Sequence, residues 1–185
     1  MSILYMNIED AVIGLKDSKQ VGPLIDQIVN HPEQMADLID CMYVQGNWRL
    51  CQKAGWPLIR MTKTHPELIT PFIPRMVSEL ENTDQHDAHI RNTVRVLQEL
   101  DIPEDDQGKL YDLCFNFMME IKYPTAVRAF SITILSRIAM AIPELQEELL
   151  SALEMIKNEG TSGFVNRANK EYARIQKEMK NRSAF

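Results

Sequence analysis

Four segments of the chain restart in the same way, and this repetition constrains the fold more than any other feature of the sequence. Each segment opens a helix at or near a proline followed by glutamate, at Pro32, Pro66, Pro103 and Pro143. Proline suits the first turn of a helix because its missing N–H would have no partner there. The prolines are 34, 37 and 40 residues apart. A period near 40 residues with two helices per period predicts an α-solenoid.

An arginine near the start of each second helix repeats with the same period. These arginines are Arg49, Arg91, Arg128 and Arg167, and their spacings are 42, 37 and 39 residues. We therefore predict one all-α domain over residues 1–185. Its N-terminal cap helices occupy 1–30, and its repeats occupy 31–64, 65–101, 102–141 and 142–181. The second helices of the repeats are predicted at 48–64, 88–100, 125–141 and 162–180.

Three local signals refine this pattern. Pro71 and Pro74 lie inside the first helix of the second repeat and should bend it, because each proline removes a backbone hydrogen bond. The helix at 125–141 is apolar nearly all round, which is typical of a helix packed on several sides. Gly160 is positioned to end the first helix of the fourth repeat, in the left-handed conformation that glycine favours.

Charge and cysteine content limit the function classes. The formal net charge of −6 disfavours nonspecific nucleic-acid binding, which depends on basic residues at phosphates. The charge is uneven, since residues 1–40 hold seven acidic residues against two lysines, while residues 161–185 hold six cations against two glutamates. Three cysteines without a C-x-x-C pair favour a reducing compartment.

The sequence also predicts a cytoplasmic protein without a membrane span. Glu9 and Asp10 interrupt the apolar run that a signal peptide would need. The longest apolar stretch, 129–142, is 14 residues long and contains Arg137, so we expect a buried helix there.

The units resemble HEAT repeats, whose pattern is a proline-containing first helix, an aspartate in the turn and an aliphatic-arginine pair opening the second helix. The best copy has Pro66 to Pro74, then Asp87, then Ile90-Arg91. The first unit departs most, because Asn47 stands where aspartate is usual. The third and fourth copies read Ala126-Val127-Arg128-Ala129 and, shifted by one residue, Val165-Asn166-Arg167-Ala168. The resemblance implies a right-handed α-α superhelix, with an armadillo-like arrangement as the alternative.

HEAT families mostly bind partners on the concave surface lined by the second helices. The resemblance therefore implies a non-catalytic scaffold or adaptor that binds a protein partner. The partner-binding candidates are polar positions of the second helices, namely Arg49, Gln52, Arg91, Arg95, Arg128, Ser131, Arg167 and Lys170. The alternative role for the repeat arginines is structural, since they can hold a neighbouring turn of the stack.

A nucleic-acid-binding function is the second hypothesis. HEAT-like DNA glycosylases bind damaged duplex in a basic concave cleft that carries tryptophan and aspartate. Trp48 and Trp56 are eight residues apart and would lie on a similar helix face. We expect one of them to pack in the core and the other to lie at its rim. The acidic net charge fits this function poorly.

The densest polar cluster runs from Asp84 to His89. His86, Asp87 and His89 could hold a metal, but zinc would need a tighter set with a further ligand from elsewhere. Asp and Asn are preferred helix caps, so a capping turn is the simpler interpretation. The sequence has no Gly-rich phosphate loop, G-x-S-x-G or H-E-x-x-H. We predict no catalytic residue, metal or cofactor.

Overall fold

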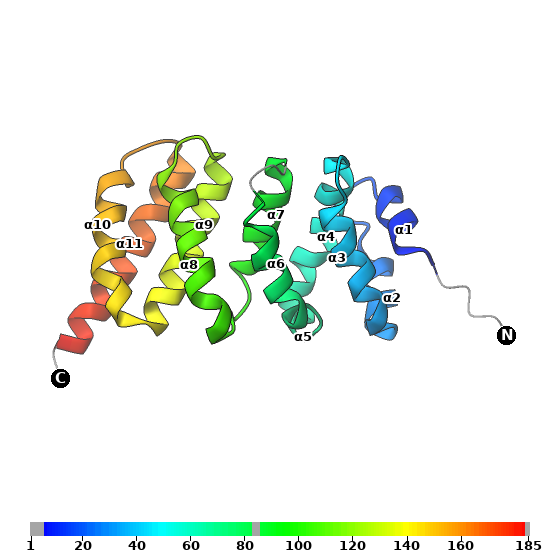
Figure 1. Ribbon diagram of the computed structural model, residues 1–185, viewed down its shortest axis with the longest axis horizontal. Coiled ribbons are helices and arrows are strands. Elements are labelled where there is room, and N and C mark those ends of the chain that lie inside the picture. Colours follow the sequence, from blue (N-terminus) through cyan, green and yellow to red (C-terminus); the bar gives the residue numbers. More distant parts are fainter. Residues whose placement is uncertain (1–5, 83–85, 184–185) are drawn as a thin grey trace. The chain divides into compact units, whose positions relative to one another are not determined.

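The computed structural model describes residues 6–82 and 86–183, and every regular element within these residues is a helix (Figure 1). The predicted all-α fold is confirmed. Contacts between residues divide the chain into two compact units, the first ending at Asp101 and the second beginning at Ile102. This division coincides with the predicted boundary between the second and third repeats, so each unit holds two of the predicted repeats.

The first unit contains the two N-terminal helices and the first two repeats. Its elements are α1 (Ile8–Gly14), α2 (Gly22–Asn30), η1 (Pro32–Gln34), α3 (Met35–Tyr43), α4 (Trp48–Thr64), α5 (Pro66–Ile69), η2 (Thr70–Phe72), α6 (Ile73–Glu79) and α7 (Asp87–Leu97).

The second unit contains the last two repeats. Its elements are α8 (Glu104–Met119), α9 (Thr125–Ala141), η3 (Pro143–Leu145), α10 (Gln146–Ile156) and α11 (Ser162–Ser183).

The repeat prolines stand where helices begin. Pro32 and Pro143 open short 3-10 turns that lead into α3 and α10, and Pro66 opens α5. Pro103 is the residue just before α8, which carries three acidic residues in its first turn, where negative charge favours the helix dipole. The proline period therefore reports the starts of the first helices.

The first helix of the second repeat is divided into three pieces, as the internal prolines predict. Helix α5 gives way to the 3-10 turn η2, which contains Pro71, and α6 begins again with Pro74 in its first turn (Figure 1). Each proline withholds an N–H from the backbone ladder, so the chain bends at these positions instead of continuing as one helix.

Helix α4 is the centre of the first unit. It packs against α1, α2, α3, α5 and α7, and its core-facing side chains Leu50, Leu58 and Met61 are almost fully buried. Helix α9 has the same place in the second unit, where it packs against α8, α10 and α11. Its apolar circumference correctly indicates a helix covered on several sides.

Three predicted bounds of the second helices differ from the structure. Helix α7 begins at Asp87, one residue before the predicted start, and α11 ends at Ser183, three residues after the predicted end. Helix α7 ends at Leu97, three residues before the predicted end, although Leu100 is buried in the following turn. The apolar period continues past the helix because the turn also packs on the core. Gly160 adopts a φ of 88°, so the predicted left-handed helix end is confirmed.

Gly55 is the point of closest fit between α4 and α7. A Cβ added to Gly55 would lie 2.9 Å from Cγ and Nδ2 of Asn92. Asn92 cannot easily move, because it is buried and its Nδ2 donates to the Cys51 carbonyl at 3.0 Å. The absence of a side chain at Gly55 therefore allows the two second helices of the first unit to pack.

We predict that Gly55→Ala lowers the free energy of unfolding by about 1–3 kcal/mol, because Asn92 must shift and lose its buried hydrogen bond. Urea denaturation measures the free energy of unfolding of the variant and of the wild type. The control is Gly108→Ala in α8, where a Cβ meets nothing within 4 Å. That change should raise stability by about 0.5–1 kcal/mol through helix propensity. If the two substitutions changed the free energy of unfolding equally, the close fit at Gly55 would not matter for stability.

Candidate partner-binding surface

In the first unit, the basic residues are concentrated on the second helices of the two repeats, α4 and α7. We call the second helices of a unit its second-helix layer. Helix α4 carries four cations and no carboxylate, and α7 carries two cations with Asp87 in its first turn. The six cations are Arg49, Lys53, Arg60, Lys63, Arg91 and Arg95. The rest of residues 1–101 has only three cations and thirteen acidic residues. The second helices of this unit are therefore basic within an acidic unit.

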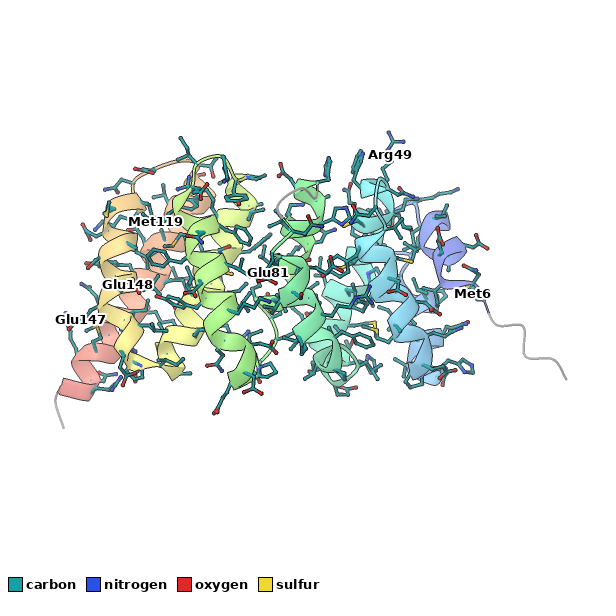
Figure 2. All side chains as sticks on the ribbon, viewed as in Figure 1. Met6, Arg49, Glu81, Met119, Glu147 and Glu148 are labelled. Carbon is teal, nitrogen blue, oxygen red and sulfur yellow. The ribbon has the colours of Figure 1, made fainter. Side chains whose placement is uncertain are left out.

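The second unit repeats this separation. Helix α9 has Arg128 and Arg137 without a carboxylate, and α11 has six cations and two glutamates. Outside these two helices, residues 102–185 have three cations and ten acidic residues. The first helices carry the acidic side chains, and Glu147 and Glu148 project from α10 in Figure 2. A net charge of −6 conceals a basic second-helix layer in each unit.

A hollow in the first unit gathers part of this basic charge. It has a volume of about 350 Å³ and is lined by Ser18, Trp56, Ile59, Arg60, Lys63 and Arg95. Four of these residues come from α4, where Ile59, Arg60 and Lys63 follow Trp56 by three, four and seven positions, so they form a single stripe on the helix. Arg95 comes from α7, and Ser18 comes from the segment between α1 and α2.

A second hollow in the first unit has the opposite charge. Its volume is about 470 Å³, and its lining includes Glu9, Asp37, Asp40 and Cys41. Asp40 already pairs with Arg75 at 2.6 Å. Burial raises the pKa of Cys41 to about 11, and the neighbouring carboxylates add to this rise.

The predicted contact residues of the first unit remain wholly or partly accessible. Arg49 is exposed and projects away from the helices (Figure 2), and its guanidinium lies 5.4 Å from the centre of the Trp48 ring. Arg95 is exposed in the basic hollow, while Gln52 and Arg91 are half-buried.

Two predicted contact residues of the second unit lie in its core, which corrects the expectation that they are surface positions. Ser131 is fully buried and donates to the Val127 carbonyl at 2.9 Å. Arg128 is only 7% exposed, and its Nε donates to the Met118 carbonyl at 2.9 Å. Its guanidinium also lies 4.6 Å from the centre of the Phe164 ring. These contacts give Arg128 the structural role that was the alternative for the repeat arginines.

The other two predicted residues of this unit lie on α11. Arg167 is half-buried and donates to the Thr133 hydroxyl on α9, so part of its side chain is held within the unit. Lys170 is exposed.

The tryptophans differ from the expectation that one of them packs in the core. Trp48 is 40% exposed and stacks on His86 with ring centres 5.3 Å apart. Trp56 is half-buried at the wall of the basic hollow. Because the core side of α4 is filled by aliphatic side chains, both indoles keep a surface that a partner can reach.

The histidine cluster forms a helix cap, although the capping side chain is a histidine and not Asp or Asn. His86 accepts from the Ala88 N–H at 3.1 Å through Nδ1, at the start of α7. His89 is buried, and its ring stacks at 6.5 Å from that of Tyr43. Burial lowers the pKa of His89 below its ordinary value. Asp84 lies outside the described residues, among which no group of three His, Cys, Asp or Glu side chains is placed to hold a metal ion.

We predict that Arg128→Met destabilises the protein by about 1–3 kcal/mol, because the buried Met118 carbonyl loses its donor. Arg95→Met removes an exposed cation and should change stability by less than about 0.5 kcal/mol. Urea denaturation of both variants checks the difference. An Arg128→Met variant as stable as the wild type would contradict a structural role for this arginine.

The cysteine thiols should be unreactive in the folded protein. Burial raises the pKa of Cys51 to about 11 and that of Cys114 to about 12, so almost no thiolate exists at pH 8. We expect a chromogenic disulfide reagent to label none of the three cysteines within minutes in buffer and all three in about 6 M guanidinium. Rapid labelling of the native protein would contradict this assignment.

The comparisons agree with the repeat pattern. The family model described as "HEAT repeat domain" matches residues 10–175. No curated protein and no solved structure matches the chain. Among the helices described, none is both long and apolar enough to cross a membrane. Each repeat has two helices, the first helices begin at or just after prolines, and the family model matches most of the chain. The chain therefore belongs to the HEAT repeat family.

Proposed function

We propose that the protein is a non-catalytic scaffold that binds a protein partner through the second helices of its repeats. In HEAT repeats these helices line the concave surface. The observation that carries the proposal is the charge separation between helix layers, which places exposed cations on α4, α7 and α11 within a chain of net charge −6. A partner with an acidic surface would be attracted to this layer and repelled by the first helices.

The accessible candidate residues support this assignment. Three of them are exposed, namely Arg49, Arg95 and Lys170. Two more are half-buried, namely Gln52 and Arg91. Arg and Trp are enriched among the residues that dominate binding energy at protein interfaces, and the first unit presents both on α4. Arg128 and Ser131 are left out of the proposed surface because they are buried.

We also propose that the protein acts in the cytoplasm. All three cysteines are free and buried, which fits a reducing compartment.

Nucleic-acid binding is the second candidate, and the basic second helices favour it more than the net charge does. Six cations on α11 fall within 22 residues, and basic side chains along a helix are a common footprint for phosphate binding. The many acidic residues of the first helices limit the area that a duplex could cover.

The proposal predicts that charge reversal on the second helices removes the partner. Wild-type protein and an Arg49→Glu/Arg91→Glu variant would be used for affinity capture from the native cell, with quantification of the bound proteins. We expect at least a fivefold loss of a specific partner from the variant, because two attractive contacts become repulsive. Circular dichroism would establish that the variant is folded.

The matched control is Lys109→Glu/Lys122→Glu, which makes the same charge change at exposed positions outside the second helices and outside the lining of the basic hollow. It should retain the partner. Equal retention by all three proteins would place binding elsewhere. If no protein is captured but duplex DNA is retained at low salt, the second candidate replaces the first.

A further inference from the structure

The basic hollow of the first unit combines charge with an apolar wall. Trp56 and Ile59 are half-buried, so their side chains pack partly on the unit and partly face the hollow. Arg60 and Lys63 follow on the same stripe of α4, and Arg95 faces them from α7. An occupant would therefore meet apolar surface and positive charge together.

The cations of the hollow form no ion pair with the part of the unit that the structure describes. Arg60, Lys63 and Arg95 are exposed, and among the described residues no carboxylate oxygen pairs with any of them. Other exposed cations of the chain do have such partners, for example Lys122 with Glu120 at 2.5 Å. Three unpaired positive charges around one hollow repel one another, and an anionic occupant would relieve that repulsion.

The hollow is also built on a fixed support. Trp56 lies between Gly55, which fits against α7, and the buried Pro57. Helix α4 packs on five other elements of the unit, so the stripe is held in position before any partner arrives. Preorganisation of this kind reduces the ordering cost of binding.

We propose that this hollow docks an acidic peptide segment of the partner protein, with one apolar or aromatic side chain against Trp56 and Ile59 and carboxylates at Arg60, Lys63 and Arg95. This inference rests on the proposed function and names the kind of segment that is bound. A volume of about 350 Å³ suits a few side chains of a peptide. The mixture of an indole and cations matches a segment in which acidic and apolar residues alternate.

A peptide fits this site better than a duplex does. Three cations provide few phosphate contacts, whereas DNA-binding proteins with strongly salt-dependent affinity make about six to ten. The rest of residues 1–101 contains thirteen acidic residues outside α4 and α7, which would repel a duplex that extends beyond the hollow. A short peptide can stay within the hollow and avoid that repulsion.

The test is a selection from a displayed library of random 12-residue peptides on the full-length protein. We expect the enriched peptides to combine Asp or Glu with Phe, Trp, Leu or Ile. Synthetic versions would be titrated against a Trp48→Phe variant, in which Trp56 is the only tryptophan and its fluorescence reports occupancy of the hollow. The affinity should fall at least fivefold as salt rises from about 50 to 300 mM, since the contacts are exposed.

The decisive variant is Arg60→Glu/Lys63→Glu, which should lower the affinity for the peptide by more than about tenfold. The matched control is Lys177→Glu/Lys180→Glu on α11, which has the same spacing and charge change at exposed positions and should alter affinity less than about twofold. Thermal melts would establish that both variants are folded.

Several results would overturn the inference. Enriched peptides without acidic residues, no enrichment, or equal binding to wild type and Arg60→Glu/Lys63→Glu would each show that the hollow does not dock acidic segments. A 20-base-pair duplex that binds more tightly than the peptides and is lost in the same variant would assign the hollow to nucleic acid. If partner capture still depends on Arg49 and Arg91 in any of these cases, the scaffold function stands and only the hollow is reassigned.

Discussion

The packing of each second helix against its neighbours is the constraint on which the rest of each unit depends. A two-helix repeat cannot cover its own apolar stripe, so α4 and α9 are buried by several elements at once. Gly55 shows how narrow the fit is, because a single Cβ there would collide with Asn92. The same packing leaves one side of α4 uncovered, and the exposed cations are found on that side.

The repeat arginines show that one sequence position can have different roles in successive repeats. Arg128 is buried, donates to the Met118 carbonyl and lies over the Phe164 ring, so it joins α8, α9 and α11. Arg49 occupies the equivalent position in the first repeat but is exposed beside Trp48. A buried carbonyl that accepts from the guanidinium, as at Arg128, gives the arginine a structural role, whereas an exposed position, as at Arg49, leaves a cation that a partner can reach.

The sequence predicts helix bounds best where strong breakers enclose a helix. Helices α4 and α9 have the predicted bounds because Gly46-Asn47, Pro124 and the repeat prolines stop them on either side. The end of α7 is less well predicted, since Leu100 stays in phase after the helix has ended. The stripe from Trp56 to Lys63 can be read from helical spacing alone. Its completion by Arg95 and Ser18 depends on tertiary packing, which no local pattern contains.

The charge layers were accessible to sequence reasoning, but only by counting charge in each predicted helix. A comparison of the two chain ends finds an acidic start and a basic finish, and a net charge of −6 suggests an acidic molecule throughout. Neither the charge of the chain ends nor the net charge describes the surface that a partner meets. Screening confines electrostatic attraction to about 8–10 Å at ordinary salt. Within that distance a partner at α4 encounters Arg49, Arg60 and Lys63 and no carboxylate of the same helix. The local charge, and not the sum over the chain, therefore determines which class of partner these repeats can bind.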